Sequence, residues 1–537
     1  MSLCDTVQTR YADLLQPQEL GLLAALQRLD HQAQCLYVRL VSRLGPWFRV
    51  SKLDYPEIGE IAPVIDALAK EQLVCEPAGL SVEELAGLYT VAELRAAYSH
   101  LLQAPTPPGK DALLTAIYAL VLDEDEHQTL VLGDSRERVI APMGGEVVQL
   151  LQLLYFGNRH QNLTEFVLSD LGIARYYPYA LDREQRFFSC REALDEYIDC
   201  CQLNDIYYEL LELGEDEALL QLAGDLLERD VRFPSSQARW ERLCNLVARQ
   251  LERLHYWDLS LRLFGRSSTH PARERRARIL AARKDWEGVV ALCQEIATAP
   301  WCEAEREAAE RILPRALRKL GGTPPRRGRE TFCEFKLRLT PFHESVEQDA
   351  AHDLQREWKS VYYVENDLMN SLFGLAFWEQ IFADVSGVFH NPYQSVPADM
   401  YLPEFSKRRE KKIVERFAAL HAGDLGQELL RVYRLYSRYK CNWTNWRRVS
   451  ETLLITALQI IPPDHLLAIW RRQLFDPREN RSGFPDLIAF GDRPGAYCLI
   501  EVKGPGDKLQ DNQKRWLRYF AQNKIPAKVA WVEWTNV

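Results

Sequence analysis

Two apolar runs near the C-terminal end of the chain constrain its fold more than any other feature. The runs Phe484–Phe490 and Leu499–Lys503 are rich in strand-forming residues, and a Gly-Asp-Arg-Pro-Gly turn separates them, so they predict a β-hairpin. Asp486 stands at the start of the first run, whereas Glu501 and Lys503 lie in the second. Because side chains alternate along a strand, Glu501 and Lys503 are expected on one face. The hairpin therefore predicts that two carboxylates and a lysine converge.

This convergence predicts a site for a hard divalent cation, because Mg²⁺ and Mn²⁺ prefer carboxylate, carbonyl and water oxygens. We expect Asp486 and Glu501 to hold one or two such ions, with the main-chain carbonyl of Val502 as a further ligand. Lys503 would orient or deprotonate an attacking water and stabilise charge on a phosphate oxygen. A Glu-x-Lys pair also occurs on solvated surface hairpins. Its combination with Pro-Asp at a strand start and a helix directly afterwards favours a nuclease.

An amphipathic helix is predicted from Lys508 to Asn523, after a turn in which Asp507 is a candidate N-cap. This helix places Gln513 one turn before the inward-facing Trp516. The run from Glu501 to Leu517 closely resembles the VRR-NUC domain, a virus-type replication and repair nuclease module with a PD-(D/E)xK core. The resemblance implies a catalytic constellation, supported by the glutamine on the helix, that consists of Asp486, Glu501, Lys503 and Gln513.

The nuclease region is expected to begin after a linker rich in Gly, Pro and Arg, Gly321–Arg329. A strand is predicted over residues 335–339, an apolar helix over Val361–Trp378, and a closing strand over residues 527–532. The sheet of this domain would therefore combine strands from both sides of a long helical segment.

Glu365, near the start of the predicted apolar helix, is a candidate for a further acidic metal ligand. It is followed seven residues later by Leu-Phe-Gly-Leu, and residues 389–399 contain Phe-x-Asn, Gln and Pro-x-Asp in that order. Both patterns resemble the Fanconi-associated nuclease family, and the resemblance implies that the helix before the core supplies this ligand. Asp367 is the alternative ligand on the same helix. The structural alternative is an acid that complements the helix dipole.

Positive charge is expected beside the metal site, because a nuclease binds a polyanion. Arg478 and Arg481 stand just before Asp486, near where a phosphate would lie, and we expect these two residues and Lys508 to contact DNA. Residues 431–448 mix basic and aromatic side chains more densely than any other stretch. The tryptophans in this stretch are expected in the core rather than on a stacking surface.

Composition limits the class of protein. The chain has 537 residues, enough for three or four domains, and its 47% hydrophobic and 26% charged residues are typical of a globular protein. No apolar run reaches the length of a membrane span and the start lacks signal-peptide features, so we expect a cytoplasmic protein that binds no membrane. The twelve cysteines lack Cys-x-x-Cys spacing, which argues against structural zinc. With a net charge of −10, DNA binding would depend on local basic patches.

The chain is expected to be multidomain and mainly α, with helical N-terminal and TPR-like domains followed by an α/β PD-(D/E)xK nuclease domain that has a small mixed sheet. Residues 1–75 are predicted to form a helical DNA-contacting domain in which Arg49 and Lys52 are candidate contacts. Its basic and aromatic order resembles the N-terminal region of the Fanconi-associated nucleases. The predicted domain ranges are 1–75, 76–145, 146–320 and 321–537, with the nuclease core at 480–537.

Two of these ranges have structural alternatives. Residues 76–145 contain a helix, a Pro-rich break and a second helix, which resembles a SAP-type DNA-binding motif, although a purely structural hairpin fits equally well. Residues 146–320 form successive helix pairs that resemble a degenerate TPR-like array without a strict period. Such arrays bind partners or space domains.

The resemblance spans almost the whole chain and is to a bacterial Fanconi-associated nuclease. It implies a metal-dependent, structure-selective endonuclease and 5′-to-3′ exonuclease that cuts 5′-flapped or other branched DNA and acts in repair of interstrand crosslinks.

The chain departs from the animal members in two ways. Their ubiquitin-binding zinc finger has no counterpart here, and Asn512 stands where they have a basic residue, which weakens the case for a 5′-phosphate pocket. The alternative functions are a non-catalytic scaffold for DNA junctions and a VRR-NUC Holliday-junction resolvase. Protein partners are not predicted.

Overall fold

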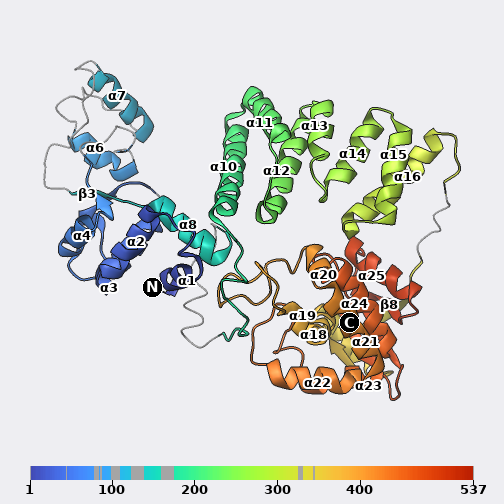
Figure 1. Cartoon of the computed structure of the whole chain (residues 1–537). Helices are drawn as coiled ribbons and strands as arrows, with labels where there is room; N and C mark the ends of the chain where they lie inside the picture. Colours follow the sequence, from blue (N-terminus) through green and yellow to red (C-terminus); the bar gives the residue numbers. More distant parts are fainter. Residues whose placement is uncertain are drawn as a thin grey trace. The chain divides into compact units, whose positions relative to one another are not determined.

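The computed structural model describes residues 2–43, 45–77, 84, 87–97, 109–122, 138–158, 174–324, 331–342 and 345–535. It divides the chain into two compact units, Met1–Gln161 and Asn162–Val537. Each unit has a hydrophobic core of its own, and the second contains several. Figure 1 colours the units along the sequence, with the first in blue to teal.

The first unit is built from short helices around a three-stranded antiparallel sheet. The strands are β1 (Phe48–Arg49), β3 (Val139–Pro142) and β2 (Val74–Cys75), in the order β1-β3-β2. Asp30 accepts a hydrogen bond from the main-chain N–H of Ala33 and so caps one helix. The described helices of this unit are α1 (Ser2–Tyr11), α2 (Pro17–Arg28), α3 (His31–Val41), α4 (Ile61–Lys70), α6 (Val91–Ala97), α7 (Lys110–Leu122) and α8 (Gly145–Phe156).

The compact units divide the chain at a different place from the predicted boundary at residue 145. Strand β3 pairs with both β1 and β2, and helix α8 contacts α1, so α8 belongs to the first unit rather than to the helix pairs that follow it. The pairing joins strands that are far apart in sequence, which local pattern does not reveal. Helices α6 and α7 contact each other as predicted for a helical hairpin, while the Pro-rich break at 105–108 lies outside the described residues.

The second unit begins with a helical array in which each helix contacts the next, and the helices lie side by side in Figure 1. Three arginines of the basic segment 273–278 in this array form ion pairs: Arg273 with Glu305, Arg275 with Glu252 and Arg278 with Glu274. The helices of this array are α10 (Arg191–Leu213), α11 (Asp216–Glu228), α12 (Pro234–Arg253), α13 (Trp257–Phe264), α14 (Ala272–Ala282), α15 (Trp286–Thr298) and α16 (Glu303–Lys319).

The rest of the second unit holds a mixed five-stranded sheet in the order β4-β8-β7-β6-β5. Its strands are β4 (Glu334–Leu339), β5 (Ser360–Tyr363), β6 (Leu487–Phe490), β7 (Tyr497–Lys503) and β8 (Ala527–Trp534). Strands β6 and β7 form the predicted antiparallel hairpin, with Leu487 opposite Ile500. Strand β8 lies between β7 and β4 and pairs in parallel with both. The predicted α/β nuclease fold with a small mixed sheet is confirmed.

Helices cover both faces of the sheet. On one face, side chains such as Ile500 and Val502 pack with helix α17 (Val346–Leu354). On the other, Ile488 and Leu499 pack with helix α25 (Asp511–Gln522) and a large helical core. The helices of that core are α18 (Asp367–Ala376), α19 (Trp378–Ile381), α20 (Glu404–Arg408), α21 (Glu410–Ala422), α22 (Leu425–Tyr436), α23 (Glu451–Ile460) and α24 (Pro463–Phe475).

Two predicted helices begin later than expected. The apolar run from Val361 is strand β5 up to Tyr363, and α18 starts at Asp367. A buried strand followed by a buried helix is one continuous apolar run, so periodicity does not separate them. Helix α25 starts at Asp511 rather than at Lys508, because the Gln513 side chain accepts the main-chain N–H of Gln510 and caps the helix there.

Among the described residues no single helix is long and apolar enough to cross a membrane. Helices α23 and α24, which form a bent pair, are long and apolar enough when taken together, but by length and composition only.

Candidate active site

The main chain brings the start of β6 against the end of β5. The carbonyl oxygen of Asp486 accepts the N–H groups of both Val364 and Glu365, each at 2.9 Å. The Asp486 carboxylate turns the other way and accepts the N–H of Val502 in β7 at 2.9 Å. Asp486 is therefore fixed between two neighbouring strands, and Glu365 is held next to it in space.

Glu501 is the most buried carboxylate of the site, with 1% of its surface exposed. Its Oε1 atom accepts hydrogen bonds from Gln513 Nε2 at 2.5 Å and lies 2.8 Å from Lys503 Nζ. Its Oε2 atom is buried and accepts no hydrogen bond from any residue that the structure describes. The predicted convergence of Glu501, Lys503 and Gln513 is thus present, and it leaves one carboxylate oxygen unused.

The environment of Glu501 disfavours its charged form. Burial raises the pKa of its carboxyl, the nearby Asp486 carboxylate adds to this rise and Lys503 opposes it, so that the pKa is about 8. Burial also raises the pKa of Asp486, and the negative charges of Glu347 and Glu365 add to that shift. Asp486 therefore interacts with three other carboxylates, those of Glu501, Glu347 and Glu365, and a bound cation would relieve this repulsion.

Glu347 was missed by the sequence analysis. It lies in the first turn of α17, whose N-cap Ser345 accepts the main-chain N–H of Gln348. In sequence it has the pattern of an ordinary acid that complements a helix dipole. Only the packing of α17 on the sheet brings its charge near Asp486. The one available signal was the place of α17 in the chain, between strands β4 and β5 of the same sheet.

Glu365 lies between strand and helix rather than on the helix. Its φ is +42°, a left-handed conformation that a non-glycine residue adopts only when its surroundings impose it. The Tyr363 hydroxyl donates to its Oε2 at 3.1 Å, and its side chain is 44% exposed. The alternative ligand, Asp367, accepts hydrogen bonds from Asn445 and Arg448 instead. Of the two, Glu365 is the acid that acts on Asp486.

The residues fit a divalent cation, although the ligand set is incomplete as it stands. No three His, Cys, Asp or Glu side chains within the described ranges are arranged to hold a metal ion together. Asp486 and Glu501 nevertheless offer carboxylate oxygens, and the unused oxygen of Glu501 is a buried acceptor that needs a partner. Val502 lies between Glu501 and Lys503 in β7, and the role of its carbonyl stays a prediction.

A basic cavity of about 900 Å³ lies beside these residues. Arg478 and Arg481 line it together with the 438–447 loop, and Asn366, next to Glu365, forms part of its wall. The Arg481 guanidinium lies over the rings of Tyr401 and Trp443, at 4.9 and 5.6 Å from their centres. The cationic residues that line the cavity are Arg175, Arg438, Lys440, Arg447, Arg478 and Arg481.

The other predicted DNA contacts differ in exposure. Lys508 is exposed, just before α25. In the first unit Lys52 is also exposed, whereas the Arg49 side chain is only 11% exposed and pairs with Glu93 at 2.8 Å. Arg49 thus forms an internal ion pair in this structure. The neighbouring Phe48 is buried in the core of the first unit.

Comparison with known proteins agrees with this geometry. Residues 422–534 match the VRR-NUC domain, and residues 1–75 match the FAN1 HTH domain. The chain is 36% identical over 535 residues to the Fanconi-associated nuclease 1 homolog of Pseudomonas aeruginosa, which covers 98% of this chain and 93% of that protein. The chain belongs to the Fanconi-associated nuclease family. It is therefore a nuclease, a hydrolase whose VRR-NUC domain contains Asp486, Glu501, Lys503 and Gln513.

Similarity extends to a human protein that is more distant in sequence and to a protein of known structure. Fanconi-associated nuclease 1 of Homo sapiens is 23% identical over 609 residues, covering 94% of this chain and 59% of the human protein. A crystal structure of paFAN1 bound to 2nt 5′ flap DNA with a gap is similar with a TM-score of 0.81 and 35% identity, and it covers 100% of this chain and 97% of that one.

Proposed function

We propose that this nuclease uses Mg²⁺ or Mn²⁺ to cut 5′-flapped and other branched DNA, as an endonuclease and a 5′-to-3′ exonuclease in the repair of interstrand crosslinks. The observation that best supports a metal ion is the buried Oε2 atom of Glu501, which lies near Asp486 and accepts no hydrogen bond from the described residues. The observation that supports the substrate is the similarity to paFAN1, which has been crystallised with 1nt and 2nt 5′ flap DNA.

Asp486, Glu501, Glu365 and the carbonyl of Val502 would hold the cation. When bound, it supplies Lewis-acid chemistry, which lowers the pKa of a water and stabilises charge on the phosphate. Glu347, whose charge also acts on Asp486, is placed to assist a second ion.

The side chains around the carboxylates have separate tasks. Gln513 holds Glu501 Oε1, so that Oε2 faces the site with a defined orientation. Lys503 Nζ, 2.8 Å from the same Oε1 atom, balances the buried negative charge and is placed to donate to a water or a phosphate oxygen. The Tyr363 hydroxyl donates to Glu365 Oε2 and so holds the Glu365 side chain.

The basic cavity supplies the substrate side of the proposal. Among the described residues that line it, six are cationic and one, Asp367, is acidic, so the cavity would attract the phosphates of a DNA strand toward the carboxylates. Arg478 and Arg481 lie on the segment just before Asp486, so a strand bound there would pass close to the cation. Trp443 is 1% exposed and serves as core rather than as a stacking surface.

Cleavage of end-labelled substrates tests the proposal. Wild-type protein would be incubated with 5′-flap, 3′-flap, four-way-junction and single-stranded DNA in Mn²⁺, Mg²⁺ or EDTA. We expect metal-dependent cutting near the 5′-flap junction. Symmetric cutting of the four-way junction would instead identify a Holliday-junction resolvase, and tight binding without any cutting would identify a scaffold; either result overturns the proposal.

A further inference from the structure

Helix α25 connects the catalytic carboxylate to the rest of the second unit. Its first turn contains Gln513, which donates to Glu501, and its next residues include Arg515 and the buried Trp516. Gln513 therefore reaches Glu501 only when α25 lies at the observed position. The contacts that fix α25 decide the orientation of Glu501.

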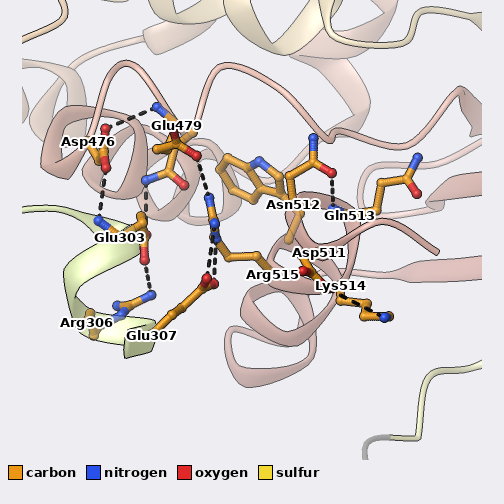
Figure 2. A network of polar contacts seen from close by, with 12 residues as sticks. Glu303, Arg306, Glu307, Asp476, Glu479, Asp511, Asn512, Gln513, Lys514 and Arg515 are labelled. Carbon is orange, nitrogen blue, oxygen red and sulfur yellow. Dashed lines mark hydrogen bonds and ion pairs between the residues drawn. The ribbon is translucent and has the colours of Figure 1, made fainter. Parts of the chain in front are cut away.

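The last helix of the array, α16, contacts α25 through an ion pair. Arg515 Nε and Nη2 donate to the two carboxylate oxygens of Glu307 on α16, at 2.8 and 3.3 Å (Figure 2). Arg515 Nη1 also lies 3.4 Å from Glu479, in the loop that leads to Asp486. Arg515 is only 7% exposed and the Glu307 side chain 17%, so water competes little for these bonds.

A second set of contacts holds α16 against the segment before the active site. The main-chain N–H of Glu303 donates to Asp476, and the buried Glu303 carboxylate accepts from Asn480 at 3.1 Å. The same carboxylate lies 2.9 Å from Arg472, whose guanidinium stacks over the ring of Trp516 on α25. Figure 2 shows Glu303 and Glu307 on α16 facing Asp476, Glu479 and Arg515. Both sets lead from the end of the array to α25.

We propose that α16 positions the active site: the Glu307–Arg515 pair sets α25 so that Gln513 holds Glu501 ready for the cation. Arg515 and Glu307 are then positioning residues for the nuclease, and the helical array is a structural part of the catalytic centre rather than only a spacer. The inference rests on the proposed metal site at Glu501.

The chain offers a matched control inside the same array. Glu252 on α12 accepts from Arg249 and Arg275, and its side chain is 14% exposed, close to the 17% of Glu307. Its partners lie on α12 and α14, so Glu252→Gln removes a comparable ion pair without a contact to α25.

The test measures Mn²⁺ binding by calorimetry and single-turnover cleavage of a 5′ flap in the full chain. We expect Glu307→Gln to weaken Mn²⁺ binding about tenfold and to lower the cleavage rate, with the KM for DNA unchanged, and Glu252→Gln to alter neither. In a Gln513→Ala background, Glu307→Gln should have no further effect, because Glu307 acts on Glu501 only through the Gln513 side chain.

Separate results would contradict the two proposals. Wild-type protein that binds no Mn²⁺ would overturn the metal site itself. Wild-type binding that Glu307→Gln leaves unchanged, or additive effects of Glu307→Gln and Gln513→Ala, would overturn the positioning role alone. If Glu307→Gln does not fold, Arg515→Lys replaces it, since it keeps the charge but loses the two parallel donors, and the same outcomes apply.

Discussion

Binding of Mn²⁺ should depend steeply on pH, because the cation competes with the proton on Glu501. The pKa of this carboxyl is raised to about 8 by burial and by Asp486. On that value about 3% of the groups are ionised at pH 6.5 and about 75% at pH 8.5. The apparent affinity for Mn²⁺ should therefore rise about 25-fold over this range, since a carboxylate binds metal only when deprotonated.

Calorimetric titration in two buffers of different ionisation enthalpy measures both the affinity and the protons released. At pH 7 wild-type protein should release nearly one proton for each Mn²⁺ bound, because about 90% of Glu501 is protonated beforehand. Glu501→Gln, which has no proton to exchange at this position, should bind weakly and release none from it. An affinity that is constant from pH 6.5 to 8.5, with no proton release, would refute the reasoning.

Three further predictions concern stability. In metal-free protein the pKa of Glu501 lies above its ordinary value, so between about pH 5 and 8 the folded chain holds a proton that the unfolded chain has lost. The free energy of unfolding should therefore fall by about 1.4 kcal/mol per pH unit over this range. Urea unfolding at several pH values should show that Glu501→Gln removes this slope. Tyr179→Phe should lower the free energy of unfolding by about 1–3 kcal/mol, because the buried hydroxyl donates to the Asn391 carbonyl at 2.6 Å and accepts the Gln394 N–H at 2.7 Å; an unchanged melting temperature would count against this. Gly483→Ala should lower the free energy of unfolding by about 1–3 kcal/mol and reduce the cleavage rate. Gly483 has a φ of +87°, and a Cβ there would lie 2.8 Å from the main chain of Asn512 at the start of α25. A variant with both the stability and the cleavage rate of the wild type would contradict this prediction.

The part of the site that is local in sequence could be predicted. The shared face of Glu501 and Lys503 follows from alternation along one strand. The role of Gln513, which donates to Glu501, was implied by the resemblance to the VRR-NUC domain. Asp486 follows from its place at the start of the facing strand. These four residues lie within a single hairpin and the helix that follows it, so they are close together in the sequence.

The part that depends on packing could not be predicted. Glu347 reaches the site because α17 covers one face of the sheet, and the sheet itself pairs β4 in parallel with β8 from the far end of the domain. Similarly, the ion pair of Arg49 with Glu93 turns a candidate DNA contact inward. The link from Glu307 to Arg515 joins two helices with no shared local pattern.

The most direct test of the account compares wild type with Asp486→Asn on one 5′-flap DNA, measuring DNA affinity by fluorescence anisotropy and Mn²⁺-dependent cleavage on the same samples. The substitution keeps the shape of a side chain that accepts the Val502 N–H but removes the carboxylate charge. We predict that cleavage falls by at least about 100-fold while DNA affinity changes little. Cleavage by Asp486→Asn at a rate close to wild type would contradict the assignment of the active site.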